Sequence, residues 1–418
     1  MHHLSPHIPS GISRPWATRP ALIGAAVLAA LLSGCANPAG SAGTGAAKAP
    51  ASDFYDWPGK LPASAPGQLL RSEPLDAATS LADAGEQLRI LYTSTDGVTG
   101  KGLVPVSGAV FFPRTPRPAG GWPVIAWAHG TVGVGDACAP SRNPRSARDK
   151  EYLNTWLREG YVVVATDYQG LGTPGPHPYL HTRSQAYSVL DSVRAVVAMP
   201  GVANKVVLVG QSQGGGAAFG TAGIAQGYAP DIHLLGTVAT GTPYLTAATV
   251  QQNSGQLDRV SPQLAYAMYA TVTARLVKPD FDPASAFLPE AQADLQASAE
   301  TCVGPMFERL SAEKRTERNT MQPGGPAKIF GAIGPAAGYA TLDLPQPVFM
   351  GTGGKDVDVP TAMQKSLVAA ACKAGSKIQW HLYPDRDHSG TVNASLPDSL
   401  PFVRRLMAGE AVDSNCGG

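Results

Sequence analysis

The stretch Lys205 to Gly216, KVVLVGQSQGGG, predicts a strand, a sharp turn and a helix. Its β-branched apolar run, Val206 to Val209, is typical of a buried strand and stops at Gly210. The small residues that follow predict a helix packed closely on a sheet. A serine at the apex of such a turn projects above the sheet, because flanking glycines let strand and helix approach. Ser212 is therefore the candidate nucleophile.

The GxSxG pattern is weak evidence by itself, because composition alone yields roughly a third of a match in a chain of this length. The strand before it and the helix after it make the match more specific. The alternative is a glycine-rich nucleotide-binding turn, since a GxGxxxG run occurs at Gly214, Gly216 and Gly220. That run begins inside the predicted helix, and no acidic residue ends the following strand. The interpretation of Ser212 as a nucleophile is therefore favoured over a nucleotide-binding turn.

The composition is that of a nearly neutral, loop-rich chain. A formal charge of +1 and 15% charged residues give no electrostatic case for nucleic-acid binding. The apolar fraction of 44% is ample for a buried core. The length of 418 residues predicts one large domain with an insertion, or two domains.

Residues 1–34 have the pattern of a signal peptide. Two arginines precede the apolar run Ala21 to Leu32, which is too short to span a bilayer as an anchor. The run ends in Leu32-Ser33-Gly34-Cys35, which resembles the lipobox of bacterial lipoproteins. The resemblance implies cleavage before Cys35, a lipid on its sulfur, and a membrane-anchored position in the cell envelope that faces the periplasm or the exterior. Ala36 favours the outer membrane in a Gram-negative host. An ordinary secretory signal is the alternative.

Five cysteines occur in the chain, and a lipid on Cys35 leaves four for disulfides in an oxidising compartment. The sequence leaves three pairings open. We prefer Cys138–Cys302 with Cys372–Cys416, because both members of the second pair lie in the C-terminal segment. None of the four has a neighbour at CxxC spacing, so no zinc site is predicted.

Residues 35–60 are expected to form a flexible tether, because this segment begins with a run rich in alanine, glycine, serine and proline. In 61–243 and 340–418, apolar strand-like runs alternate with helical patterns, which predicts a mostly parallel α/β sheet. In 244–339 the strand-like runs vanish and prolines separate helical pieces. We expect a helical lid there, over the active site; a helical decoration remote from the site is the alternative. Strands are predicted at 87–93, 107–112, 124–128, 161–166, 206–209, 233–240, 347–350 and 378–383, and helices at 151–159, 185–198 and 362–372.

A glycine-rich loop follows the predicted strand at 124–128. It begins with His129-Gly130-Thr131 and runs to Gly135. Such a loop suits an oxyanion hole, because a small residue lets a backbone N–H point at developing negative charge. The expected donors are the amides of Thr131 and of Gln213, the residue after the nucleophile. The alternative is that the glycine only ends the strand and begins a loop, with no catalytic role.

A serine nucleophile needs a histidine and an acid later in the chain. His388 is the only histidine after the last predicted strand. Asp356 and Asp358 both follow the strand at 347–350, which gives the order Ser…Asp…His. Asp167 precedes the nucleophile and lies at a tight turn, so a structural role is expected for it.

The order of these motifs resembles the secretory lipase family of α/β-hydrolases, which includes fungal lipases and many bacterial secreted esterases. The matching pieces are Ala128-His129-Gly130-Thr131, the run Gly160 to Tyr168 with Gly170-Leu171-Gly172, the elbow Gly210 to Gly215, Asp356 with Val359-Pro360, and His388. The family's acid lies three residues before a Val-Pro pair, which favours Asp356. The roomy Gly353-Gly354-Lys355 loop leaves Asp358 open. The family's lid lies where residues 244–339 fall.

The resemblance implies an α/β-hydrolase fold and a serine carboxylic-ester hydrolase, a lipase or an esterase. It implies a Ser212–Asp356–His388 triad, an acyl-enzyme, an ester or lipid substrate, and no metal or organic cofactor. An envelope acyltransferase or peptidase with the same triad is the alternative enzyme. A non-catalytic binding lipoprotein is the alternative of another class.

Overall fold

The computed structural model describes residues 54–62, 64–253, 258–261 and 263–417. The predicted signal peptide, Cys35 and most of the predicted tether lie outside these residues. The strands are β1 (Leu69–Pro74), β2 (Ala84–Thr95), β3 (Leu103–Pro113), β4 (Trp122–Ala128), β5 (Val162–Thr166), β6 (Val202–Gln211), β7 (Leu234–Thr240), β8 (Val348–Gly353) and β9 (Ile378–Tyr383). Within the described residues they form one nine-stranded sheet, in the order β1-β2-β3-β5-β4-β6-β7-β8-β9.

The sheet is parallel from β5 to β9 and antiparallel from β1 to β5. The central parallel strands are buried on both faces, as the continuous apolar run Val206 to Val209 predicts, whereas the edge strand β9 is only partly buried. The prediction of a mostly parallel α/β sheet is therefore confirmed. β1 was not predicted, because most of its residues are exposed and show no apolar run.

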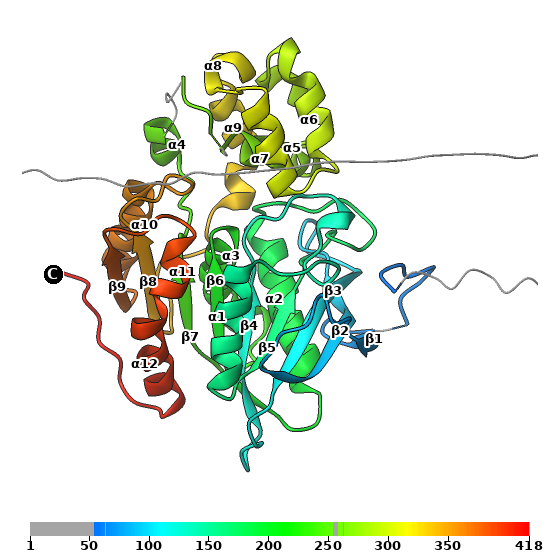
Figure 1. Cartoon of the computed structure of the whole chain (residues 1–418), viewed down its shortest axis with the longest axis vertical. Coiled ribbons are helices and arrows are strands. Elements are labelled where there is room, and N and C mark those ends of the chain that lie inside the picture. The colour runs from blue at the N-terminus through cyan, green and yellow to red at the C-terminus, as the bar shows by residue number, and fades with distance from the viewer. Residues whose placement is uncertain (1–53, 63, 254–257, 262, 418) are drawn as a thin grey trace, which may run out of the picture. The chain divides into compact units, whose positions relative to one another are not determined.

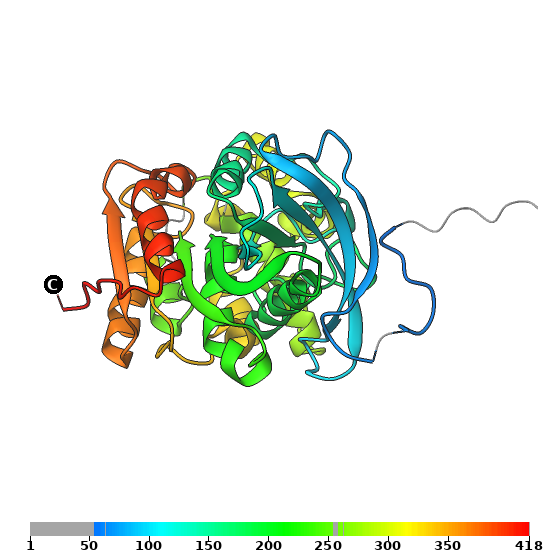
Figure 2. The ribbon, with the colours of Figure 1, turned by 90° about the horizontal axis from the view of Figure 1, so that it is seen from below.

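Helices cover both faces of the sheet (Figures 1 and 2). They are α1 (Ala147–Arg158), α2 (Thr182–Val197), α3 (Gln213–Tyr228), α10 (Thr361–Ala374), α11 (Gly390–Ala394) and α12 (Leu396–Met407). Side chains of α2, α3 and α10, such as Phe219 and Leu367, pack in one core cluster. Side chains of α1 and α12, such as Trp156 and Phe402, pack in the other. Among the described residues, no helix is long and apolar enough to cross a membrane.

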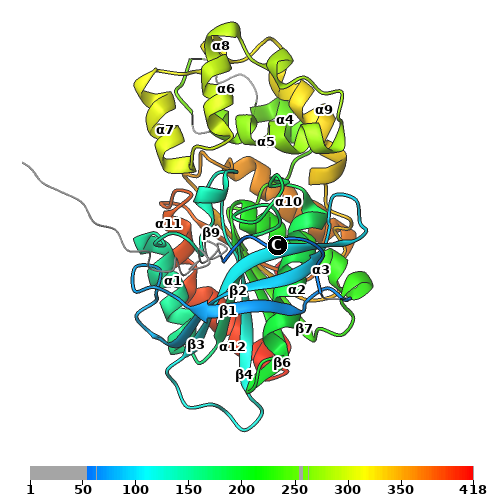
Figure 3. The same cartoon turned by 90° about the vertical axis from the view of Figure 1, so that its right-hand side faces the viewer.

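The chain between β7 and β8 is helical. It contains α4 (Ala247–Asn253), α5 (Gln263–Val277), α6 (Gln292–Ser298), α7 (Val303–Ala312), α8 (Glu317–Thr320) and α9 (Gly325–Ala337), with short 3₁₀ turns at Pro283–Ala286 and Pro289–Ala291. These helices have their own core, which includes Met268, Phe287 and Met306. Figures 1 and 3 show them grouped above one end of the sheet. This helical segment coincides with the insertion expected at 244–339.

The described part of the chain contains two disulfides, Cys138–Cys302 and Cys372–Cys416, which confirms the preferred pairing. Cys138 ends a short 3₁₀ helix (Asp136–Cys138) in the loop after β4, and Cys302 precedes α7. Beside this bridge, the backbone N–H of Val303 donates to the carbonyl of Val132 at 2.8 Å. The helical segment is therefore fixed covalently to the loop that follows β4.

The packed part of the chain begins earlier than the expected position near Leu61. Phe54 and Tyr55 are buried, and the Tyr55 hydroxyl lies 3.0 Å from Ser141 Oγ. The guanidinium of Arg142 stacks 3.6 Å from the centre of the Tyr55 ring. These two aromatic residues lie inside the predicted tether, and a pair is too short to give a periodic signal. Residues 54–60 are therefore part of the fold, which corrects the predicted boundary.

Candidate active site

Ser212 lies at the turn between β6 and α3, with φ 59° and ψ −124°. A non-glycine residue at positive φ is strained and is held there by its surroundings. A Cβ at Gly210 would lie 2.0 Å from the Gly214 carbonyl oxygen, and one at Gly214 would lie 1.9 Å from the Ala128 oxygen. Only glycine fits at either position, so the sequence forces the sharp turn. The serine side chain is thereby presented at the carboxyl end of the central strand.

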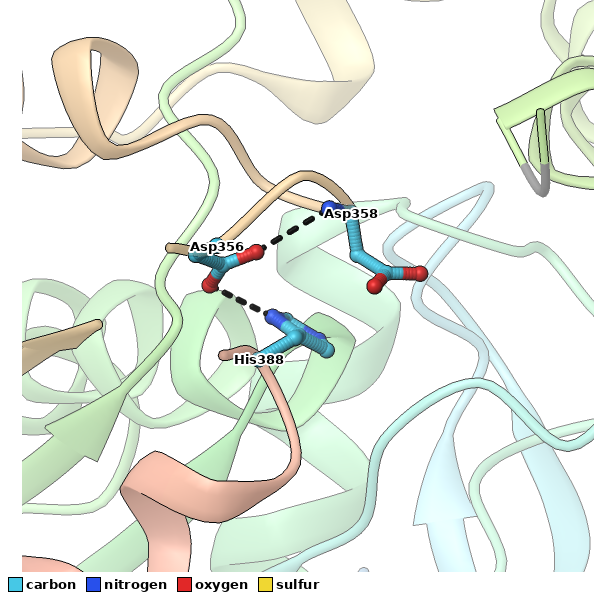
Figure 4. Close-up of side chains that lie close together, drawn as sticks. All are labelled: Asp356, Asp358 and His388. Carbon is cyan, nitrogen blue, oxygen red and sulfur yellow. Dashed lines mark hydrogen bonds and ion pairs between the residues drawn. The ribbon is translucent and has the colours of Figure 1, made fainter. Parts of the chain in front are cut away.

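His388 and Asp356 form a close pair (Figure 4). His388 Nδ1 lies 2.7 Å from Asp356 Oδ2, and both side chains are buried. Asp356 follows β8, and His388 follows β9. The carboxylate is fixed further by Gln364 Nε2 at 2.8 Å from Oδ2, and by the N–H groups of Asp358 and Val359, which donate to Oδ1 at 3.0 and 2.9 Å. Asp356 can therefore orient the imidazole and balance a positive charge on it.

Asp358 points in a different direction from Asp356. Its Oδ1 accepts a hydrogen bond from the Tyr266 hydroxyl at 3.0 Å. Asp356, Asp358 and His388 are the one set of side chains in the described chain that is close enough to share a metal ion, with ligand atoms within 4.8 Å of one another. Both Asp356 oxygens already accept two hydrogen bonds each from protein groups. The arrangement therefore suits proton transfer better than metal binding.

Gln211 holds the other nitrogen of the histidine. Its Nε2 lies 2.9 Å from His388 Nε2. Because Nδ1–H donates to Asp356, the Nε2 lone pair accepts from the Gln211 amide. Within the described residues no hydrogen bond joins Ser212 to His388. Sequence reasoning missed Gln211, because the GxSxG pattern places no requirement on that position.

The two expected oxyanion donors lie on adjoining segments. The Thr131 hydroxyl lies 2.7 Å from the Tyr179 hydroxyl, and Gln213 Nε2 lies 3.3 Å from His177 Nε2. Among the hydrogen bonds between described residues, none uses the backbone N–H of Thr131 or of Gln213. Burial lowers the pKa of His177 to about 4, so its ring is neutral at pH 7.

Asp167 fixes the loop after β4, as expected for a structural residue. It is buried, and it accepts hydrogen bonds from Ser107 Oγ at 2.7 Å and from the Ser141 N–H at 2.9 Å. The Ser141 hydroxyl also donates to it. These bonds join β3, the end of β5 and the loop after β4. The loop that carries Thr131 is therefore held at Ser141.

Two cavities meet at Ser212. One has a volume of about 230 Å³ and is largely apolar; its lining includes Leu180, Leu245, Leu264, Met321 and Met363. The other has a volume of about 700 Å³ and is more polar; its lining includes Gln211, His388, Asn143, Arg148 and Asp149. Thr131, Ser212, Tyr266 and Asp358 line both. An ester whose carbonyl carbon lies at Ser212 would have one part in each cavity.

Comparison with known proteins gives a consistent result. A family model described as "Secretory lipase" matches residues 146–415. The secreted triacylglycerol lipase LIP7 of Malassezia globosa is 25% identical over 393 residues, which covers 87% of this chain and 80% of the relative. Lipase A of Moesziomyces aphidis is 23% identical over 391 residues, with 87% and 81% covered.

Solved structures share the fold. Candida antarctica lipase A in its closed state aligns with a TM-score of 0.66 at 20% identity, covering 84% of this chain and 85% of that one. The rice cell wall degrading esterase LipA of Xanthomonas oryzae aligns with a TM-score of 0.66 at 23% identity, covering 83% of this chain and 100% of that one. Identities this low support the fold alone. The fold is that of the α/β-hydrolases, as expected from the sequence.

Proposed function

Because this chain belongs to the secretory lipase family and is a carboxylic-ester hydrolase, we propose that Ser212, His388 and Asp356 are its catalytic triad. The main support is the geometry of the histidine. Asp356 Oδ2 lies 2.7 Å from His388 Nδ1, and this histidine lines the same cavity as Ser212. This is the arrangement in which a serine hydroxyl can lose its proton to an oriented imidazole.

The reaction proceeds through an acyl-enzyme. Ser212 Oγ attacks the ester carbonyl carbon while His388 Nε2 takes the hydroxyl proton. The tetrahedral intermediate then loses the alcohol, which receives that proton from His388. Water attacks the acyl-enzyme by the same route and releases the acid. The Gln211 amide, 2.9 Å from Nε2, has to leave this nitrogen before the first step.

The backbone amides of Thr131 and Gln213 are proposed as the oxyanion donors. Gln213 begins α3, a 16-residue helix, so its N–H lies at the positive end of the helix dipole. Neither N–H donates a hydrogen bond to another described residue, so both are available to the oxyanion of the tetrahedral intermediate. Each such donor contributes about 3 kcal/mol to transition-state stabilisation.

Labelling with a fluorophosphonate tests the nucleophile. We expect one phosphonyl group per chain, measured by intact mass, and peptide mapping should place it on the peptide that contains Ser212. Protein unfolded in denaturant is the control, because it lacks the oriented base. Labelling at another serine, or equal labelling of the unfolded chain, would contradict the assignment.

The size of the apolar cavity predicts a preference for short to medium acyl chains. Its volume of about 230 Å³ lies below the range of about 300–1,000 Å³ that is usual for ligand pockets. We expect kcat/KM for p-nitrophenyl esters to be highest between butyrate and octanoate and to fall toward palmitate. The series would be measured below the solubility limit of each ester, on enzyme titrated for active sites. A steady rise to palmitate would refute this prediction.

We further propose that the protein is exported and carries a lipid at Cys35. The Leu32-Ser33-Gly34-Cys35 tetrad directly after an apolar run supports the anchor, although Cys35 lies outside the described residues. Export is also supported by the two disulfides and by the name of the Malassezia globosa relative, a secreted triacylglycerol lipase.

Cys35→Ser tests the anchor. In a bacterial host fed with labelled palmitate, the parent chain should carry the label and sediment with membranes. Cys35→Ser should carry no label and stay in the supernatant. Ser212→Ala, which changes the proposed nucleophile only, should be labelled like the parent. An unlabelled parent chain would leave the ordinary secretory signal as the explanation of the leader.

A further inference from the structure

Two of the four residues that line both cavities are joined to each other. Tyr266 lies on α5, and Asp358 lies in the loop after β8. The Tyr266 hydroxyl donates to Asp358 Oδ1 at 3.0 Å. Figure 4 shows the Asp358 side chain turned away from Asp356. The hydrogen bond therefore lies where the apolar and the polar cavity meet, and Ser212 lines both cavities as well.

Neighbouring contacts fix this pair in place. The Tyr266 ring packs edge to face on Phe307, with ring centres 5.6 Å apart. Gln263 Nε2, one turn before Tyr266, donates to the Val357 carbonyl at 3.1 Å. Burial and the Asp358 charge raise the pKa of Tyr266, so the phenol stays protonated and remains a donor. The acid loop and α5 are thus joined at the boundary of the two cavities, which Ser212 also lines.

The chemistry of the proposed triad assigns a part of the ester to each cavity. His388 has to donate its proton to the leaving alcohol. His388 lines the polar cavity of about 700 Å³ and is not among the residues that line the apolar one. The alcohol part of the substrate therefore belongs in the polar cavity, and the acyl part belongs in the apolar cavity of about 230 Å³.

We propose that Tyr266 and Asp358 form a partition above Ser212 that separates an acyl site from an alcohol site and limits the length of the acyl chain. The inference rests on the proposed function, since it assumes an acyl-enzyme at Ser212. The substrate class is an ester of a short to medium apolar acid with a polar alcohol. The polar groups of Asn143, Arg148 and Asp149 line the alcohol side.

Removing the Tyr266 side chain tests the partition. In Tyr266→Ala the two cavities should merge, so a longer acyl chain gains room. The ratio of kcat/KM for p-nitrophenyl decanoate to that for butyrate should rise about tenfold or more. Tyr266→Phe keeps the ring and loses the hydrogen bond, so its ratio should rise by a smaller factor. The ratio does not depend on the fraction of folded enzyme, which keeps the test valid for a destabilised variant.

Tyr269→Phe is the matched control. Tyr269 lies on the same helix and lines neither cavity, and its hydroxyl donates to the Thr301 carbonyl at 2.9 Å. The decanoate to butyrate ratio should stay at the parent value in this variant. A ratio in Tyr266→Ala within about twofold of the parent, or an equal rise in Tyr269→Phe, would overturn the partition. Ester turnover that does not depend on Ser212 would instead overturn the proposed function.

The parent enzyme also tests the assignment of the alcohol site. With the butyryl group held constant, the glycerol monoester should have a higher kcat/KM than the butan-1-ol ester, because its free hydroxyls can form hydrogen bonds in the polar cavity. The reverse order would overturn that assignment.

Discussion

Replacing Ser212 with alanine is expected to lower kcat for p-nitrophenyl butyrate by about 10⁵-fold or more, because the elbow then presents no oxygen nucleophile to the ester. The backbone of the turn should persist, because its geometry depends on the glycines at 210 and 214 and not on the serine hydroxyl. Activity of the purified variant would be measured together with its thermal unfolding midpoint. That midpoint should be close to the parent value.

Ser192→Ala provides a matched control for this change. Ser192 is also buried and donates to the Val189 carbonyl within α2 at 2.7 Å, away from the site. Its replacement removes one hydroxyl with the same change in volume. We expect its kcat to remain within about threefold of the parent. If Ser212→Ala loses less activity than about tenfold, the nucleophile lies elsewhere.

The second large effect is expected at Asp356. Asparagine at this position presents an N–H to His388 Nδ1, which then becomes an acceptor and moves the ring proton to Nε2. A protonated Nε2 cannot take the proton of Ser212, so kcat should fall about 10⁴-fold. The measurement is kcat for p-nitrophenyl butyrate across the pH range, with the thermal midpoint as a check on folding.

Asp358→Asn is the paired variant, because it makes the same chemical change two residues away. An asparagine oxygen at 358 can still accept from Tyr266, and Asp356 still holds His388. We expect its kcat to exceed that of Asp356→Asn by about 10³-fold. The opposite order would identify Asp358 as the acid of the triad.

Much of the fold follows from local sequence. Val206 to Val209 and Val124 to Ala128 are apolar on both faces and become central parallel strands. The turn at Ser212 also follows from local sequence, because a Cβ at position 210 or 214 would lie within 2.0 Å of a backbone oxygen, so only glycine fits there. β1 cannot be predicted in this way, because it pairs with β2 without burying a face of its own, and its sequence therefore carries no apolar pattern.

The arrangement around His388 is harder to derive, because its contacts join distant parts of the chain. Gln211 and His388 are 177 residues apart, and Tyr266 and Asp358 are 92 apart. No periodicity or spacing relates such pairs. Asp356 and Asp358 both follow the same strand, and in the sequence only the Val-Pro pair three residues after Asp356 separates them. The fold distinguishes them, because the loop turns Asp356 toward His388 and Asp358 toward α5.

The two disulfides divide the proposed triad in a way that matters for proteolysis. Cys138–Cys302 closes a covalent ring that contains Ser212, and Cys372–Cys416 closes a second ring that contains His388. One cut inside either ring opens it without releasing a fragment, so nucleophile and base stay on one covalent molecule. Only a cut in the segment 303–371, which carries Asp356, puts Ser212 and His388 on separate pieces. For an enzyme exposed to foreign proteases, that segment is the one whose backbone must be kept from cleavage.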